Sequence, residues 1–308
     1  MLLSLATAAL ATLSALSQVD TTVPVASGQR LEVDAFGGEI TVRTWNRNAL
    51  RVQADPSSRA QVQISTAGST VSLRTEGHRG PPAVDLEITT PAWMGLDLSG
   101  VNGDVSVHGA KGPVTVETVQ GNVDVTGGQG IVSLRSVQGS VTLRGARGRI
   151  DVHSVNQDVS VSDAAGELTA ETVNGEITLA RVDATSLDAS TVNGDLSYDG
   201  PIHNGGRYSL SSHNGDVTLA VAAGSNAAVS VSTFSGEFES EFPVTINETR
   251  KGRRFNFSIG TGSAQVTLES FQGTVQLVRP GSRALRDRAQ DHDEDHDADH
   301  DDHENDDR

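Results

Sequence analysis

The sequence predicts an all-β protein, a β-solenoid that grows along a single axis from two-strand coils of about 18 residues. One observation is a repeated phrase of the type Val-Asn-Gly-Asp-Val, because a fixed period of this size is typical of stacked coils. Another is the composition, since 32 Gly and only 4% aromatic residues suit thin coils filled by small aliphatic side chains. The phrase starts at Val101, Val119, Val137, Val155, Val173, Val192, His213 and Phe234.

Each coil is predicted to contain two short strands joined by turns. In Val114–Glu117 and in Asp104–Val107 apolar residues alternate with polar ones, which is the pattern of a strand with one buried face. A two-stranded unit alone is marginally stable in water, so neighbouring coils must cover its apolar face. With about 4.8 Å per coil, roughly eight coils predict a rod on the order of 40 Å long.

Alignment of the coils places aliphatic residues in two inward-facing columns, whose successive members we expect to stack in register. The first column contains Val114, Val132, Ile150, Leu168, Leu187, Tyr208 and Val229. The second contains Val116, Leu134, Val152, Ala170, Ala189, Leu210 and Val231.

Three further columns are polar or glycine, and we expect them to stabilise the backbone. Small hydroxyls can satisfy backbone groups where a strand bends, amides can form a hydrogen-bonded ladder, and glycine suits a left-handed turn. Gln157 interrupts the glycine column, so we expect strain or a changed turn there. The hydroxyl column is Thr118, Ser136, Ser154, Thr172, Thr191, Ser212 and Thr233. The amide column is Asn102, Gln120, Gln138, Asn156, Asn174, Asn193 and Asn214.

Residues 1–17 are predicted to be a secretory signal peptide. Leu2–Leu16 is an apolar stretch too short to span a bilayer, and Ala15-Leu16-Ser17 fits a cleavage site for small residues. The stretch has no Lys or Arg at its start, unlike most signal peptides, and a buried or interfacial helix is the alternative. We therefore expect the protein to be secreted, periplasmic or at the cell surface, with no transmembrane segment after cleavage.

The rest of the chain divides into three predicted parts. Residues 18–95 form an N-terminal strand-rich part of the solenoid domain, and residues 96–278 form the regular coils with a C-terminal cap. Within the cap, the repeated phrase returns at Val266–Val275, which we expect to be the last coil. Residues 279–308 form a tail that is first rich in Arg and then in Asp and His, and such a charged segment is predicted to be disordered.

A family resemblance rests on Phe36–Val42 and Thr44–Arg47, followed by the tandem phrases. This arrangement resembles the bacterial β-strand-repeat family described as "putative adhesin", a domain of unknown function. The resemblance extends over roughly residues 25–278. It implies a secreted or envelope-exposed β-solenoid without assigned chemistry, and it supplies no catalytic residues.

The acidic tail contains the candidate metal ligands His292, His296, His300 and His303. They are spaced four, four and three residues apart and are interleaved with Asp, so on a helix they would form one stripe. Imidazole and carboxylate together suit Zn²⁺, Ni²⁺ or Cu²⁺. A solvated acidic tail with only weak metal binding is the favoured interpretation, and no cofactor is expected.

Charge and motifs restrict the function. A net charge of −17 argues against nucleic acid or an anionic membrane as a partner, and zero Cys excludes disulfides and Cys-ligated metal sites. No nucleophile elbow, zinc-protease motif or phosphate loop is present. The outward residues Glu117, Asp151, His153, Glu171 and Asp188 are the one candidate catalytic cluster, but a solvated face is favoured.

We therefore expect a non-enzymatic scaffold or adhesion module of the cell envelope. Its partner would be an envelope or surface ligand, either a glycan or a protein. Two alternatives remain open: a polysaccharide-active β-helix enzyme, and a metal-sequestering protein that uses its tail.

Overall fold

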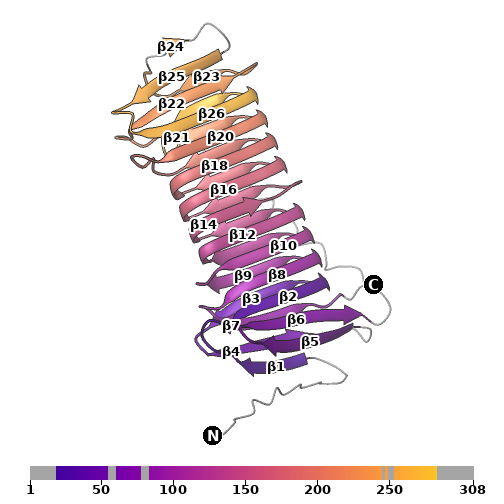
Figure 1. Cartoon of the computed structure of the whole chain (residues 1–308). Coiled ribbons are helices and arrows are strands. Elements are labelled where there is room, and N and C mark those ends of the chain that lie inside the picture. The colour runs from indigo at the N-terminus through magenta and orange to yellow at the C-terminus, as the bar shows by residue number, and fades with distance from the viewer. Residues whose placement is uncertain (1–18, 55–59, 78–82, 245–246, 249–252, 283–308) are drawn as a thin grey trace, which may run out of the picture.

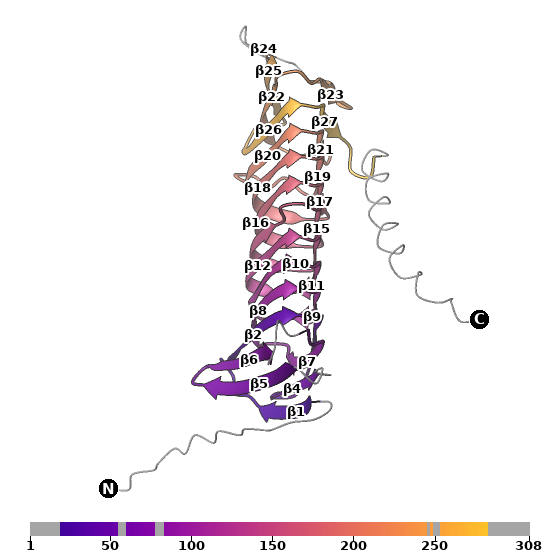
Figure 2. The same cartoon turned by 90° about the vertical axis from the view of Figure 1, so that its right-hand side faces the viewer.

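The computed structural model describes residues 19–54, 60–77, 83–244, 247–248 and 253–282, and every regular element within them is a β-strand. The strands form two long sheets that face each other along one axis (Figure 1 and Figure 2). This confirms the predicted all-β solenoid. Within the described ranges, no helix is long and apolar enough to cross a membrane.

One sheet has 13 strands and the other has 14. The 13-stranded sheet runs, in spatial order, through β1 (Val19–Pro24), β4 (Ala49–Ala54), β7 (Leu86–Pro91), β3 (Ile40–Trp45), β9 (Val105–Ala110), β11 (Val123–Gly127), β13 (Val141–Arg144), β15 (Val159–Ser162), β17 (Ile177–Ala180), β19 (Leu196–Asp199), β21 (Val217–Ala220), β27 (Val275–Val278) and β23 (Phe238–Ser240). The 14-stranded sheet runs through β24 (Asn247–Glu248), β25 (Arg253–Ile259), β22 (Ala227–Thr233), β26 (Ala264–Gln272), β20 (Arg207–Asn214), β18 (Asp183–Asn193), β16 (Ala165–Asn174), β14 (Arg147–His153), β12 (Gln129–Gln138), β10 (Val114–Gln120), β8 (Gly95–Asn102), β2 (Arg30–Gly37), β6 (Thr70–Gly77) and β5 (Ala60–Ala67).

The rod is longer than the phrase count predicts. Thirteen strands make 13 − 1 = 12 steps, and at about 4.8 Å per step they span roughly 58 Å. The estimate of about 40 Å is wrong because the N-terminal and C-terminal parts add strands at both ends of the regular coils.

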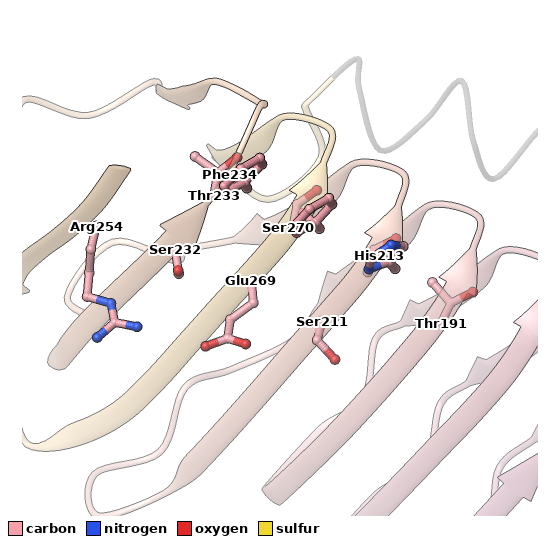
Figure 3. A pocket seen from close by; sticks show the side chains of 11 residues that line it. Thr191, Ser211, His213, Ser232, Thr233, Phe234, Arg254, Glu269 and Ser270 are labelled. Atoms are coloured by element: carbon pink, nitrogen blue, oxygen red, sulfur yellow. The ribbon is translucent and has the colours of Figure 1, made fainter. Parts of the chain in front are cut away.

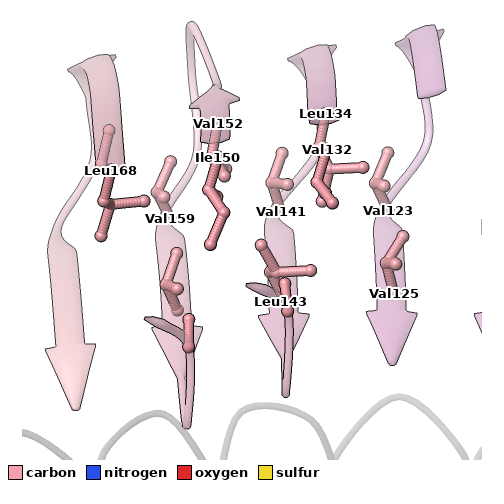
Figure 4. Packing of buried hydrophobic residues seen from close by; sticks show 14 of the residues in the cluster. Val123, Val125, Val132, Leu134, Val141, Leu143, Ile150, Val152, Val159 and Leu168 are labelled. Atoms are coloured by element: carbon pink, nitrogen blue, oxygen red, sulfur yellow. The ribbon is translucent and has the colours of Figure 1, made fainter. Parts of the chain in front are cut away.

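The inward aliphatic columns are confirmed in the central coils. Val116 pairs with Leu134, and Leu134 pairs with Val152, in parallel register. All three side chains are completely buried. Figure 4 shows Leu134 and Val152 packed against Val141 and Leu143 of the opposite sheet. The space between the sheets is therefore one continuous apolar core, about two side chains thick.

The polar columns act as predicted at most positions, but the hydroxyl of Thr118 has no hydrogen-bond partner among the described residues. The hydroxyl of Ser136 donates to the carbonyl of Gly121 at 2.9 Å, and the hydroxyl of Ser212 donates to the carbonyl of Gly194 at 2.9 Å. In the amide column, Asn214 Nδ2 donates to Asn193 Oδ1 at 2.7 Å. These bonds satisfy polar groups at the bend where the chain passes from one sheet to the other.

The glycine column has a steric cause. Gly121 has a φ of +152°, and a Cβ atom there would lie 2.1 Å from the carbonyl oxygen of Gly103 in the preceding coil. At Gln157 the turn changes as expected: among described residues, the non-glycine positive-φ positions are Asp163 and Arg181, not Gln157. Instead, β14 ends early at His153, and the Gln157 backbone N–H donates to the hydroxyl of Ser154 at 3.2 Å.

Two tyrosines fill the core where the coils become longer. Tyr198 and Tyr208 are buried with ring centroids 5.9 Å apart, and the Tyr208 hydroxyl donates to the carbonyl of Ala184 at 2.8 Å. Burial raises the pKa of both phenols above the ordinary value. Their role is therefore to pack a wider coil and to hydrogen-bond its backbone as neutral groups.

At the C-terminal end the coils are not stacked in sequence order, which corrects two expectations. Val266 pairs with Tyr208 on one side and with Val229 on the other, so Tyr208 and Val229 are not neighbours. The phrase at Val266–Val275 is thus not the last coil, because β26 and β27 insert between the strands that precede them in sequence.

Antiparallel strands stand at both ends of the rod, whereas the central pairs are parallel. At the N-terminal end β1 pairs antiparallel with β4 and β5 with β6, and at the other end β25 pairs antiparallel with β22. These strands do not continue the coil pattern, so they interrupt the edge on which a further coil would stack. The predicted signal peptide (1–17) and residues 283–308 of the predicted tail lie outside the described residues.

Candidate functional site

The outer face of the 14-stranded sheet carries an exposed apolar column along the rod. Most members directly precede a residue of the amide column, and Phe36 and Phe234 hold the same place before Gly37 and Ser235, so strand pairing aligns the column. Its central valines are substantially exposed, as Val119 (45%) and Val192 (42%) show. The column, from end to end, is Phe36, Val101, Val119, Val137, Val155, Val173, Val192, His213, Phe271 and Phe234.

Beside it runs a second outward column, which we call the charged column. Its members are also aligned by strand pairing. Charged side chains of both signs are interspersed in it with serines. The charged column is Ser99, Glu117, Arg135, His153, Glu171, Ser190, Ser211, Glu269, Ser232 and Arg254.

The apolar column changes character at the C-terminal end, where rings replace valines. The rings of His213 and Phe271 stack with centroids 4.7 Å apart and planes 8° from parallel. Those of Phe271 and Phe234 stack at 4.7 Å and 1°. Phe234, the outermost ring, is 72% exposed. The three rings together form a rigid aromatic ridge that rises from the sheet.

A groove lies between this ridge and the charged column (Figure 3). Its cavity volume is about 630 Å³, within the range of about 300–1,000 Å³ that is usual for small-molecule sites. In Figure 3, Ser211, Glu269, Ser232 and Arg254 lie in one row across neighbouring strands. The groove forms here because long side chains and rings border the short side chains of Ser211 and Ser232.

The groove contains polar groups that the protein does not use. Within the part of the chain that the structure describes, the side chains of Ser211, Ser232 and Glu269 have no hydrogen-bond or ion-pair partner. The more deeply placed hydroxyls differ, since Ser212 and Ser270 donate to backbone carbonyls at 2.9 Å. A ligand in the groove would thus meet a carboxylate and two hydroxyls that are available for hydrogen bonds.

The predicted carboxylate cluster is only partly assembled. His153 lies between two carboxylates. Its Nε2 contacts Asp151 Oδ1, and its Nδ1 is 3.2 Å from Glu171 Oε2. Asp188 is separated from Asp151 by the strand that carries Thr169, and Glu117 is separated from His153 by Arg135. The structure therefore brings together three of the five residues, Asp151, His153 and Glu171.

The structure does not locate the predicted metal ligands of the tail. His292, His296, His300 and His303 lie outside the described residues, so metal binding by the tail stays a prediction. Among the residues that the structure does describe, no group of three or more His, Cys, Asp or Glu side chains is arranged to hold a metal ion.

The aromatic groove was missed by reasoning from the sequence. A signal was present, because His213, Phe234 and Phe271 occupy the position in the phrase that valine occupies elsewhere. Their meeting in one stack depends on the insertion of β26 between β20 and β22, which the linear order of the phrases does not show.

Comparison with known proteins places the chain as follows. The sequence model of a family described as Toastrack DUF4097 matches residues 19–278. No curated protein matches the sequence.

Similar solved structures include three bacterial proteins. A "putative adhesin" from Bacteroides fragilis is 13% identical, with 86% of this chain and 98% of that chain covered and a TM-score of 0.43. A "putative lipid binding protein" from Parabacteroides distasonis is 9% identical (85% and 97% covered, TM-score 0.37). A "putative cell adhesion protein" from Clostridium sporogenes is 7% identical (85% and 98% covered, TM-score 0.22).

Proposed function

The chain belongs to the Toastrack DUF4097 family, and from this premise we propose that it is a secreted or envelope-associated, adhesin-like scaffold without enzymatic activity. It would bind an envelope or surface ligand through the outer face of the 14-stranded sheet. One observation carries the proposal: a continuous exposed apolar column runs along a rod whose backbone groups are held by regular ladders. Soluble monomeric proteins rarely expose contiguous apolar surface of this kind unless it contacts a partner.

Rigidity supports the same proposal. The core of the central coils is filled, and at most described bends a hydroxyl donates to a backbone carbonyl, so outward side chains are fixed at steps of about 4.8 Å. A surface that is already ordered loses little conformational entropy on binding, which favours recognition of an extended ligand. The net charge of −17 continues to argue against nucleic acid as that ligand.

The binding face can be tested with beads coated with the protein and mixed with bacterial envelope preparations. Val137→Lys combined with Val173→Lys places charge on the apolar column at exposed sites, so adhesion should fall while folding persists. The matched control, Thr126→Lys with Ser162→Lys, alters the outer surface of the 13-stranded sheet and should leave adhesion unchanged. Equal adhesion of both variants would contradict the proposed face.

The location and the absence of enzymatic activity need separate measurements. Cell fractionation should place the full chain outside the cytoplasm. Incubation with cell-wall glycans should yield no cleavage product, because Glu117 and Asp188 are each separated by an intervening strand from the group that contains Asp151 and His153. A product that disappears with Asp151→Asn would instead establish the alternative of a polysaccharide-active enzyme.

A further inference from the structure

The groove at the C-terminal end combines two kinds of surface that are rarely adjacent on this rod. One side is the aromatic ridge of His213, Phe271 and Phe234, and the other is the row that contains Glu269. Elsewhere along the rod the apolar column contains valines apart from Phe36 at the far end, and the charged column contains mostly short or mutually paired side chains. The groove is therefore a local feature of this end of the rod. Its two sides would complement a ligand that has one apolar and one polar face.

The aromatic side favours C–H groups. Phe234 has one described ring partner, Phe271, and remains 72% exposed, so much of its ring surface is available. The face of an aromatic ring carries negative electrostatic potential, which attracts C–H groups polarised by neighbouring oxygen atoms. The axial C–H groups of a sugar ring have this character.

The polar side favours hydroxyl donors. Glu269 presents a carboxylate with no protein partner among the described residues, and such an oxygen forms strong charge-assisted bonds with O–H groups. Ser211 and Ser232 flank Glu269 on the neighbouring strands and can both donate and accept. This set matches a row of hydroxyls along one edge of a saccharide.

The dimensions favour a chain over a single sugar. The lining residues come from five adjacent strands, β18, β20, β26, β22 and β25, in that spatial order. Four steps of about 4.8 Å give a groove roughly 19 Å long that follows the axis of the rod. A short linear oligosaccharide that lies along this axis would contact both the aromatic ridge and the row of Ser211, Glu269 and Ser232.

Other ligand classes fit less well. An anionic ligand would meet the carboxylate of Glu269, and a cationic ligand would meet the guanidinium of Arg254 in the same row. An entirely apolar ligand would remove Glu269 and the two serines from water without replacing their hydrogen bonds, which is costly.

Together these observations point to the groove as a saccharide site, and we propose that it binds a neutral, linear oligosaccharide. The aromatic ridge would pack against its C–H faces, while Glu269, Ser211 and Ser232 bind its hydroxyls. This inference rests on the proposed adhesive function and names the class of ligand and the part of the face that selects it.

The test uses the full chain and a panel of neutral oligosaccharides, namely β-1,4-linked glucose, α-1,4-linked glucose, β-1,4-linked N-acetylglucosamine and α-linked mannose. Binding is detected by saturation-transfer NMR and quantified by calorimetry. At least one panel member should bind. Phe234→Ala and Glu269→Gln should each weaken it by about tenfold or more, because each removes a contact on one side of the groove.

Matched controls are available in the same two columns far from the groove. Phe36→Ala removes an exposed phenylalanine from the other end of the apolar column, and Glu117→Gln removes an exposed carboxylate from the charged column. Both should leave saccharide affinity unchanged. Thermal melting of all four variants will show whether each remains folded.

The possible outcomes separate this site from the proposed function. Failure of every panel saccharide to bind, equal affinity in the groove variants and the wild type, or occupation of the groove by a peptide instead would overturn the saccharide site. If coated beads still adhere to envelopes when the groove variants are used, the adhesive function stands without it. If adhesion is lost only when Val137→Lys is combined with Val173→Lys, the adhesive function likewise stands without the saccharide site.

Discussion

Short polar side chains after the glycine of each phrase connect one coil to the next. Asp104 Oδ1 accepts the backbone N–H of Asn122 at 2.7 Å, and Asn122 Oδ1 in turn accepts the N–H of Ser140 at 2.9 Å. Asp195 does the same for the N–H of Asp216 at 2.7 Å. Asp and Asn are suited to this position because their side-chain oxygen accepts a backbone N–H one coil away.

The glycine of the phrase should be the position that tolerates substitution least. Gly121→Val would place Cβ about where the carbonyl oxygen of Gly103 already stands, at a φ unfavourable for any side chain. We expect the free energy of unfolding to fall by at least about 1–2 kcal/mol. Urea denaturation measures it. Gln157→Gly is the matched control, because the turn there has a different shape, and it should change stability by less than about 1 kcal/mol. Equal effects would contradict the steric explanation.

Asp163 and Arg181 occupy positive-φ turns one coil apart and form a bidentate ion pair, with nitrogen–oxygen distances of 2.8 and 2.7 Å. The hydrogen bonds from Arg181 lower the pKa of Asp163 below its ordinary value. A lowered folded-state pKa means that the pair stabilises the protein above the unfolded-state pKa of about 4, and that this stability is lost as the pH falls through the folded-state pKa.

Asp163→Asn should therefore lower the free energy of unfolding near pH 7 and not near pH 2. The loss at pH 7 should be below about 1 kcal/mol, because both side chains are more than half exposed and solvent screens the pair. Asn also tolerates positive φ, so the turn is kept. Denaturation at the two pH values measures the difference. Asp188→Asn, an exposed carboxylate without a described partner, should show no such change, and a pH-independent loss at Asp163 would refute the assignment.

Among the strands, β26 has the position that matters most for the candidate site. It comes after β22 and β25 in sequence, yet it lies between β20 and β22 in the sheet. Its insertion places Phe271 between His213 and Phe234. Three phenylalanines close the core beyond it, with the ring of Phe238 5.5 Å from that of Phe255 and 5.6 Å from that of Phe257.

Hydrogen exchange should show that β26 is internal. Its backbone amides in Val266–Ser270 lie between two paired strands, so we expect them to exchange about as slowly as those of β20. The short edge strand β24 and its neighbour β25 should exchange faster and serve as the internal control. Exchange in β26 that matches β25 would indicate a terminal coil and would contradict the inserted order.

The whole molecule is a rod of repeated coils, and strands that depart from the repeat stand at its two ends. The middle consists of parallel pairs in constant register, and antiparallel strands stand at both ends. In such a structure each coil contacts mainly its neighbours, so stability is close to a sum of local terms. A long rigid surface is the consequence, and the adhesive function proposed above relies on it.

Metal binding by the tail is a prediction from the sequence. We expect the intact protein to bind Zn²⁺ in the micromolar range through His292, His296, His300 and His303, and to lose affinity below about pH 6 as imidazole takes up protons. Calorimetry measures the uptake. Deletion of residues 291–308 should abolish Zn²⁺ uptake while the melting temperature of the solenoid stays unchanged. Equal uptake by the shortened chain would contradict metal binding by the tail.

Register along the rod was predictable because it follows from a local period. Once about 18 residues return the chain to the same face, Val116, Leu134 and Val152 must align, and the hydroxyl of Ser136 must meet the turn below it. The same reasoning singles out Gln157, where strain or a changed turn is expected because a side chain is unfavourable in a left-handed turn; the structure shows the changed turn.

Residue order alone thus determined the all-β solenoid and its core columns, whereas the exposed apolar column was recognised only in the folded chain. Only the folded chain decided which coils meet at the C-terminal end, and hence that His213, Phe271 and Phe234 form one ridge beside Glu269. The physical reason is that all the phrases have nearly the same pattern, so the pattern alone does not show whether β22 or β26 lies beside β20. Local sequence does not distinguish these pairings, whereas the shared burial of Phe238, Phe255 and Phe257 at the end of the core depends on the whole arrangement.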